Sequence, residues 1–145
     1  MPVNNFSVGA DASIDLYDGT SQAIIKINAV TGFDAKQMTK RIDVRPLDGP
    51  PRFLELPQGW EGTLEVERAD GVLDDWIASL ETAYYSGGNV AAASITQTIT
   101  EPDGTTKQYR FDKAVFKLTD AGSWKADASV KMKLDWAAST RKRVV

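Results

Sequence analysis

The side chains in this chain that could act as a catalytic acid–base pair are its carboxylates. The 145 residues contain no histidine and no cysteine, which removes the commonest general base, the thiolate nucleophile and most transition-metal ligands. Paired carboxylates can cleave a glycosidic bond, and two pairs lie close together in the sequence, Asp15 with Asp18 and Asp74 with Asp75. A small hydrolase built on these aspartates is therefore one hypothesis.

Both aspartate pairs also have a simpler structural interpretation. Asp18 is followed by Gly19, and Asp-Gly is a strong turn signal. Asp74 and Asp75 would point about 100° apart on a helix, where carboxylates in the first turn are favoured by the helix dipole. In addition, no glycine pattern matches a phosphate-binding loop. We therefore expect no catalytic residue, no cofactor and no metal site, and predict that the protein is not an enzyme.

Most of the chain alternates between apolar and polar residues, which predicts strands. Pro102-Asp103-Gly104 predicts a hairpin turn, and the alternation changes phase near Asp112 and Lys113, where we expect a β-bulge. The alternation over 126–136 predicts an eleven-residue strand about 36 Å long. Further extended segments are expected at 12–16, 21–30, 33–44, 60–68, 94–101 and 106–118.

One segment, over about 70–86, has the apolar periodicity of a helix. Asp70 is a candidate N-cap and Gly87 a candidate C-terminal stop. Its apolar stripe consists of Val72, Leu73, Trp76, Ile77, Leu80, Ala83 and Tyr84. The sequence therefore predicts one domain over 1–145, mainly β with one helix, in which a β-sandwich or barrel is flanked by that helix.

A long inter-strand loop is predicted over about 40–59. Four of the six prolines lie there, and proline resists both helices and central strands. Charges of both signs precede large apolar side chains, a combination typical of protein interfaces. We expect this loop to be a contact segment between subunits, carried by Lys40, Arg41, Asp43, Arg45, Asp48, Arg52, Phe53 and Leu54.

Tryptophans favour an alternative function of a different class. Trp76 lies on the helix stripe and Trp136 on the apolar face of the last strand, so both are expected in the core. Trp60 and Trp124 lie at strand entrances, where an indole ring can stack against a sugar. The alternative hypothesis is a carbohydrate-binding β-sandwich, which would be a stable monomer.

Charge argues against binding nucleic acid through its phosphates. The formal net charge is −3, and the sequence pI is about 5.0. The one basic cluster, Arg141, Lys142 and Arg143, is expected to be a solvated or subunit-binding tail. No apolar run approaches the ~20 residues of a membrane span, and no signal peptide is recognised, so we expect no membrane anchor.

These patterns together resemble the tail tube proteins of phages with contractile tails, which are related in fold to the tube protein of type VI secretion systems. The resemblance covers nearly the whole chain and includes an N-terminal pair of strands. Its segments are KRIDVRPLDGPPRFLELPQGWEG, the helix DGVLDDWIASLETAYYSGG, the turn EPDGTT, YRFDKAVFKLTDAG and KADASVKMKLDWAAS.

The resemblance implies a structural role in a virion. Six subunits would close into a ring, and rings would stack into a hollow tube through which DNA passes without specific binding. Sheath, tape measure and baseplate or terminator proteins would be its partners, and the protein would be made in the bacterial host cytoplasm. The polar face of the last predicted strand would face the lumen, through Asp127, Ser129, Lys131, Lys133 and Asp135.

Overall fold

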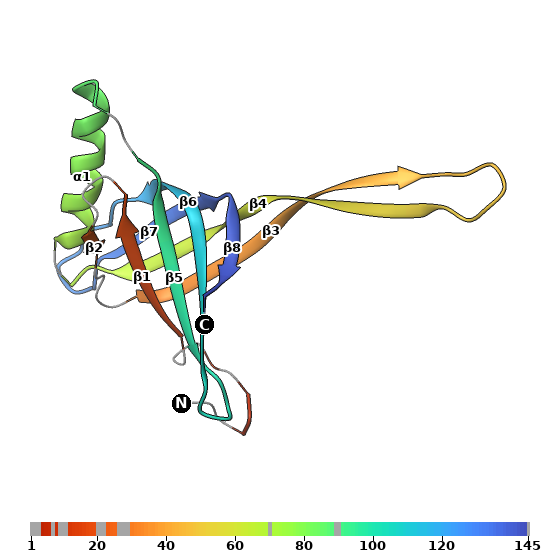
Figure 1. Ribbon diagram of the computed structural model, residues 1–145. Helices are drawn as coiled ribbons and strands as arrows, with labels where there is room; N and C mark the ends of the chain where they lie inside the picture. The colour runs from red at the N-terminus through yellow and green to blue at the C-terminus, as the bar shows by residue number, and fades with distance from the viewer. Residues whose placement is uncertain are drawn as a thin grey trace.

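The described residues form an open antiparallel sheet with one helix beside it (Figure 1). A computed structural model describes residues 4–6, 8, 12–19, 23–25, 30–69, 71–88 and 91–144. Its elements are β1 (Ala12–Asp18), β2 (Ala23–Ile25), β3 (Val30–Val44), β4 (Arg52–Glu67), α1 (Val72–Tyr85), β5 (Ala93–Thr100), β6 (Thr106–Asp120), β7 (Lys131–Ala138) and β8 (Thr140–Arg143). The prediction of a mainly-β subunit flanked by a helix is confirmed.

Strand β6 divides the sheet into two halves. The strands run in the order β2-β1-β5-β6-β7-β4-β3, and β8 also pairs with β6. The two halves face each other across a core whose largest fully buried side chains are Phe111, Leu16, Leu64, Ile95 and Leu134. The strands do not close into a barrel, so both halves end in edge strands.

A β-bulge in β6 makes this division possible. Ala114 pairs with Ala93 and Phe111 with Ile95, so two residues of β6 stand opposite one residue of β5. Lys113 has a positive φ of 54°, as the extra residue of a bulge often requires. Phe111 and Ala114 are therefore both buried, although residues three positions apart in a regular strand point to opposite faces. The predicted bulge at Asp112 and Lys113 is confirmed.

The prediction for the last long strand is wrong in its position. Residues 126–130 form a turn and loop, and β7 begins only at Lys131. After a break at Ser139, β8 continues the same antiparallel register against β6, so the ribbon runs from Lys131 to Arg143. The basic cluster Arg141, Lys142 and Arg143 is therefore part of a paired strand and is not a tail.

The predicted long loop over 40–59 is also wrong. Residues 40–44 and 52–59 are strand, and only 45–51 connects them. Three of the four prolines lie in this connection, at Pro46, Pro50 and Pro51. Pro57 lies opposite Thr39, next to a register shift, where proline is tolerated in a strand.

The helix predicted over about 70–86 is confirmed as α1, which begins two residues later, at Val72. Its N-cap is Gly71, which makes no side-chain capping bond, and the predicted cap Asp70 lies outside the described residues. Leu73 and Trp76 are buried beneath the helix, and the Trp76 ring meets the Phe116 ring edge-on. Among the described residues, no helix combines the length and apolar composition that crossing a membrane demands.

The N-terminal strand predictions are confirmed in part. The alternation over 12–16 lies within β1, and Ile14 and Leu16 face the core. The segment predicted over 21–30 contains β2 and the first residue of β3. Its remaining positions, 21–22 and 26–29, lie outside the described residues.

Candidate assembly surfaces

The most prominent surface is a two-stranded arm formed by residues 40–56, which projects from the body of the sheet (Figure 1). Strand β4 pairs with β7 only from Trp60 onward, so in the arm each strand pairs only with the other. Residues 52–59 of β4 lie beyond Trp60, and at about 3.4 Å per residue they give the arm a reach of about 27 Å. A lone two-stranded hairpin is only marginally stable in water, so we expect contact with another chain to stabilise the arm.

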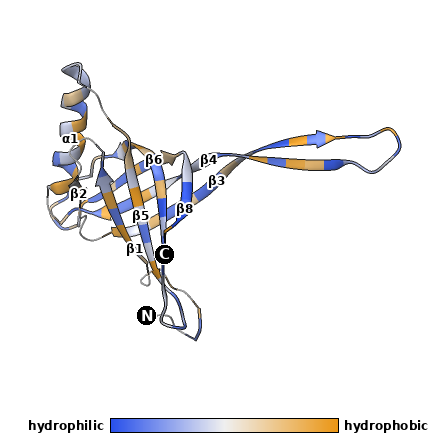
Figure 2. Cartoon of the chain, viewed as in Figure 1, coloured by the Kyte–Doolittle hydropathy of each residue, from blue (hydrophilic) through white to orange (hydrophobic). Residues whose placement is uncertain are grey.

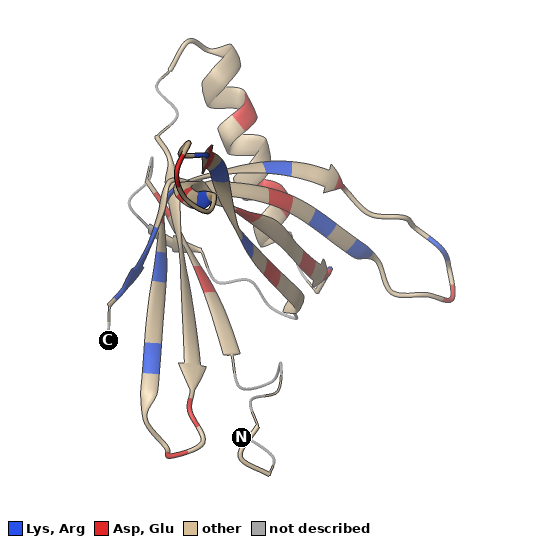
Figure 3. Cartoon of the chain, turned by 90° about the vertical axis from the view of Figure 1, so that its right-hand side faces the viewer, with Lys and Arg blue, Asp and Glu red and all other residues tan. Residues whose placement is uncertain are grey.

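The two faces of the arm differ in chemistry. Cross-strand pairs share a face, and the pairs Ile42–Leu54 and Lys40–Leu56 put large apolar groups on one side together with Val44. The opposite side carries Arg41, Glu55, Asp43 and Phe53. Figure 2 shows apolar bands along the arm, and Figure 3 shows its charges. All eight residues predicted as a contact segment thus lie on this arm, as strand and turn residues.

An ion pair organises the polar side of the arm. Arg41 Nε donates to Glu55 Oε1 at 2.7 Å, and the Thr39 hydroxyl donates to Glu55 Oε2 at 2.8 Å. The hydrogen bond from Arg41, followed by that from Thr39, lowers the pKa of Glu55 from its ordinary value. Because the pair is exposed, we expect it to fix the register of the arm more than to stabilise it.

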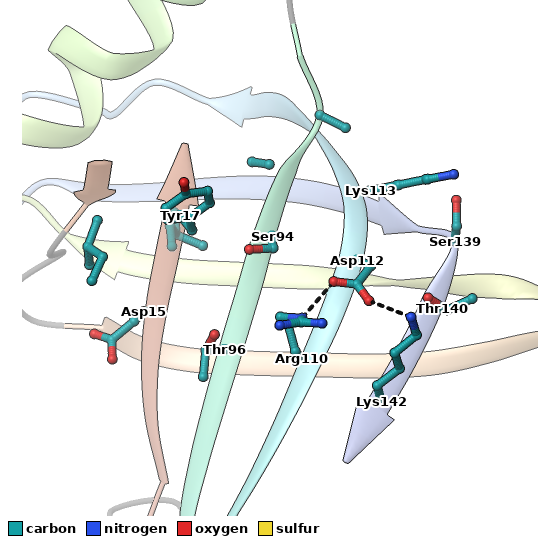
Figure 4. A pocket seen from close by; sticks show the side chains of 14 residues that line it. Asp15, Tyr17, Ser94, Thr96, Arg110, Asp112, Lys113, Ser139, Thr140 and Lys142 are labelled. Carbon is teal, nitrogen blue, oxygen red and sulfur yellow. Dashed lines mark hydrogen bonds and ion pairs between the residues drawn. The ribbon is translucent and has the colours of Figure 1, made fainter. Parts of the chain in front are cut away.

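A second surface is the concave outer face of β1, β5, β6 and β8 (Figure 4). It encloses a hollow of about 900 Å³ that is lined by Thr96, Thr140 and charged side chains of both signs. Asp112 accepts a hydrogen bond from Arg110 Nε at 2.8 Å and pairs with Lys142 Nζ at 3.6 Å. This face was not predicted from the sequence, because β8 was expected to be a tail.

The polar face of β7 is a third surface, and it carries three of the five predicted lumen residues. Lys131, Lys133 and Asp135 alternate with buried apolar residues, as predicted. Lys133 stands opposite Glu65, Lys131 opposite Glu67, and Asp135 opposite Lys117. Asp127 and Ser129 do not share this face, because they lie in the exposed loop before the strand.

The guanidinium of Arg141 packs against an aromatic cluster at the base of the arm. It lies 3.8 Å from the ring centroid of Tyr109, 5.1 Å from that of Trp60 and 5.6 Å from that of Phe111. Its Nε is buried and has no hydrogen-bond partner among the described residues. Cation–π attraction therefore holds this side chain in place, and it joins β8 to the strand from which the arm extends.

Neither aspartate pair is arranged for hydrolysis. Asp15 is exposed and Asp18 is buried, because residues three apart in a strand face opposite sides of the sheet. Asp74 accepts a hydrogen bond from Arg68 Nε at 2.8 Å, whereas Asp75 is exposed. Each pair therefore has the structural role that turn and helix-start chemistry predict.

The tryptophans offer little support for sugar binding. Trp60 is half-buried and packs edge-on against Phe111, beneath Arg141. Trp124 is 70% exposed, but Arg68 lies over its ring at 5.3 Å from the centroid. Trp76 and Trp136 are buried in the core, as predicted.

The overall fold of this chain is similar to that of several solved structures. A chain in the sheath/tube terminator of an extracellular contractile injection system (PVC) matches with a TM-score of 0.63 at 19% identity, over 100% of this chain and 96% of that one. A chain in the sheath-tube complex of that system matches with a TM-score of 0.60 at 20% identity, over 90% of this chain and 86% of the other.

The SPP1 tail tube also matches, with a TM-score of 0.63 at 10% identity, over 94% of this chain and 78% of that chain. The chain has the tail-tube fold. No protein-family model and no curated protein sequence matches it. The assignment of the tail-tube fold therefore rests on structural similarity over nearly the whole chain and not on sequence identity.

Proposed function

We propose that the protein is a structural, non-catalytic subunit of a phage tail tube, in which hexameric rings stack into a hollow conduit for DNA. The observation that carries this proposal is the combination of the tail-tube fold with an arm that pairs with no further strand among the described residues. Exposed strand edges and apolar patches are liabilities in a monomer, and assembly removes both.

The arm is the proposed contact between rings. Phe53 is 58% exposed and Leu54 is 48% exposed, so both retain apolar surface that a neighbouring subunit can bury. The flanking charges would set the register of the contact and disfavour incorrect pairings. The prolines of the turn limit the conformations that the arm must give up on docking.

Two polar faces are candidates for the surface that lines the channel. The predicted β7 face has its charges opposite charges of the other sign, which also suits a solvent-facing sheet. The concave face lies between β2 and β8, whose outer edges have no strand partner among the described residues. Edge pairing between subunits would join copies of this half-sheet into one closed wall, so we favour the concave face for the lumen.

Charge is consistent with a conduit for DNA. Six copies of a chain of net charge −3 give a ring of −18, which disfavours adhesion of DNA if the lumen shares that sign. Sheath, tape measure, baseplate and terminator proteins are the proposed partners, and the virion tail is the proposed location. No membrane anchor is required for this role.

Assembly of the purified protein tests the proposal. We expect light scattering to detect rings or tubes as protein concentration rises, and Arg45→Glu combined with Arg52→Glu to suppress tubes while leaving the circular dichroism unchanged. These two arginines are chosen because neither has an ion-pair partner among the described residues, unlike Arg41. A wild-type chain that stays monomeric at high concentration across salt conditions would contradict the tube.

Thiol labelling identifies the channel face, because the chain has no cysteine of its own. In assembled tubes, Thr96→Cys on the concave face should be protected from a bulky maleimide, whereas Lys133→Cys on β7 should react. The opposite pattern of labelling would indicate that the polar face of β7 lines the lumen.

A further inference from the structure

An apolar groove runs between helix α1 and the second half of β6. It has a volume of about 540 Å³ and is lined by Ile77, Leu80 and Tyr84 of the helix and by Val115 of the strand. Tyr84 is 70% exposed and Val115 is 59% exposed, so both keep apolar surface that another chain can cover. The groove therefore has the surface of a binding site that the described residues leave unfilled.

The apolar face of the arm matches this groove in chemistry. Val44, Leu54 and Leu56 are each between 43% and 48% exposed, and they share that face with Lys40 and Arg52. No carboxylate lies on that face, because Asp43 and Glu55 point to the opposite side. The arm thus offers an apolar stripe bordered only by positive charge.

Among the described residues that line the groove, the one charged side chain is the carboxylate of Glu81. Helix α1 carries Asp74, Asp75 and Glu81 and has no lysine or arginine between Val72 and Tyr85. Glu81 lines the groove, and it makes no ion pair among the described residues. An apolar stripe flanked by cations is therefore complementary to an apolar groove whose one charged lining residue is a carboxylate.

The positions of the two surfaces exclude a contact within one copy. The arm projects from one end of the molecule, and α1 lies against the other end (Figure 1). A contact between two different patches of identical chains is head-to-tail, and such contacts propagate into rings or filaments. The same pair of surfaces can therefore be used by every copy in an assembly.

We propose that the apolar face of the arm docks into the α1–β6 groove of a second copy of this chain. The inference rests on the proposed function and specifies the receptor for the arm. Leu54 and Leu56 would lie against Leu80 and Val115 of the second copy. The basic residues of the arm would then lie near the acidic helix.

Crosslinking between two single-cysteine chains tests the contact. We would mix Leu54→Cys protein with Tyr84→Cys protein under assembling conditions and add a short bifunctional maleimide. The matched control replaces Tyr84→Cys with Thr106→Cys, an exposed position at the opposite end of β6 from the groove. We expect a covalent dimer with the groove cysteine in at least tenfold excess over the control.

A pair of charge variants gives a second readout. Val115→Glu places a carboxylate in the groove, and Thr119→Glu makes the same change of charge at an exposed position of β6 outside it. We expect Val115→Glu to raise the concentration needed for assembly at least tenfold, with an unchanged melting temperature, and Thr119→Glu to assemble like the parent protein.

The outcomes separate this inference from the proposed function. If tubes form but the groove cysteine crosslinks no better than the control, or if Val115→Glu assembles normally, the arm docks elsewhere. The inference about the groove is then wrong, but the proposed tube function is not affected. A parent chain that never assembles would overturn both.

Discussion

Truncation of the arm's apolar face should weaken assembly by a predictable amount. Leu54 is 48% exposed and Leu56 is 44% exposed, so each keeps about half of its side chain for a partner. Complete burial of a leucine contributes roughly 1.5–3 kcal/mol, so docking should gain about 1 kcal/mol at each position. Leu54→Ala combined with Leu56→Ala should therefore cost about 2 kcal/mol per contact, or roughly a 30-fold increase in critical concentration.

Sedimentation of assemblies over a dilution series measures this critical concentration. Asp43→Ala is the matched control, because it changes an exposed residue of the same arm on the opposite face. We expect urea unfolding to give the same stability for all three proteins, since the arm contributes little to the core. An unchanged critical concentration in the double variant would refute the reasoning, because the apolar face could not then be buried in the assembly.

Three further predictions concern the fold of the subunit. Leu134→Asp should abolish folding, as judged by circular dichroism, because an unpaired buried charge costs several kcal/mol, whereas Ser129→Asp in the exposed loop should be tolerated. NMR titration should find the pKa of Glu55 below its ordinary value, and in Arg41→Gln the pKa of Glu55 should rise toward that ordinary value. The stabilisation from the pair of Arg41 and Glu55 is then fully present above the ordinary pKa and is lost as the pH falls through the lowered pKa. Lys113→Gly should stabilise the protein by about 1 kcal/mol in urea unfolding, because a lysine at φ of 54° is strained and a glycine is not; a loss of stability would show that the Lys113 side chain contributes more than its strain costs.

Local patterns were sufficient to predict the elements that pack against the core. Alternation in β1 and β7 identified buried faces correctly, because one side of each strand meets the core. The phase change near Asp112 predicted the bulge for the same reason: both Phe111 and Ala114 must point inward. The helix followed from its apolar stripe, of which Leu73 and Trp76 are buried.

Prediction failed where the chain leaves the core. In the arm, prolines and charges were interpreted as a loop, although Pro57 lies beside a register shift and the other prolines lie in the turn. No periodic burial exists there to indicate a strand, because both faces of the arm are largely exposed in the part of the chain that the structure describes. The basic cluster at Arg141 was missed as a strand because its partners, Tyr109 and Trp60, are distant in sequence.

The candidate surfaces illustrate the same limit. Eight residues of the arm were proposed as contacts from composition, but Val44 and Leu56 were not among them. The division of the arm into an apolar face and a polar face required the register of β3 on β4. The concave face and the α1–β6 groove combine residues from several elements, so single-segment patterns cannot reveal them.

Electron microscopy of the purified protein tests the central claim most directly. We predict end-on views of rings with sixfold symmetry and an open centre, and side views of stacked rings that shorten when the arm is altered at Arg45 and Arg52. A field of single, compact particles at all protein concentrations would contradict the proposal that the protein is a tube subunit. It would favour the alternative hypothesis of a monomeric, carbohydrate-binding β-sandwich.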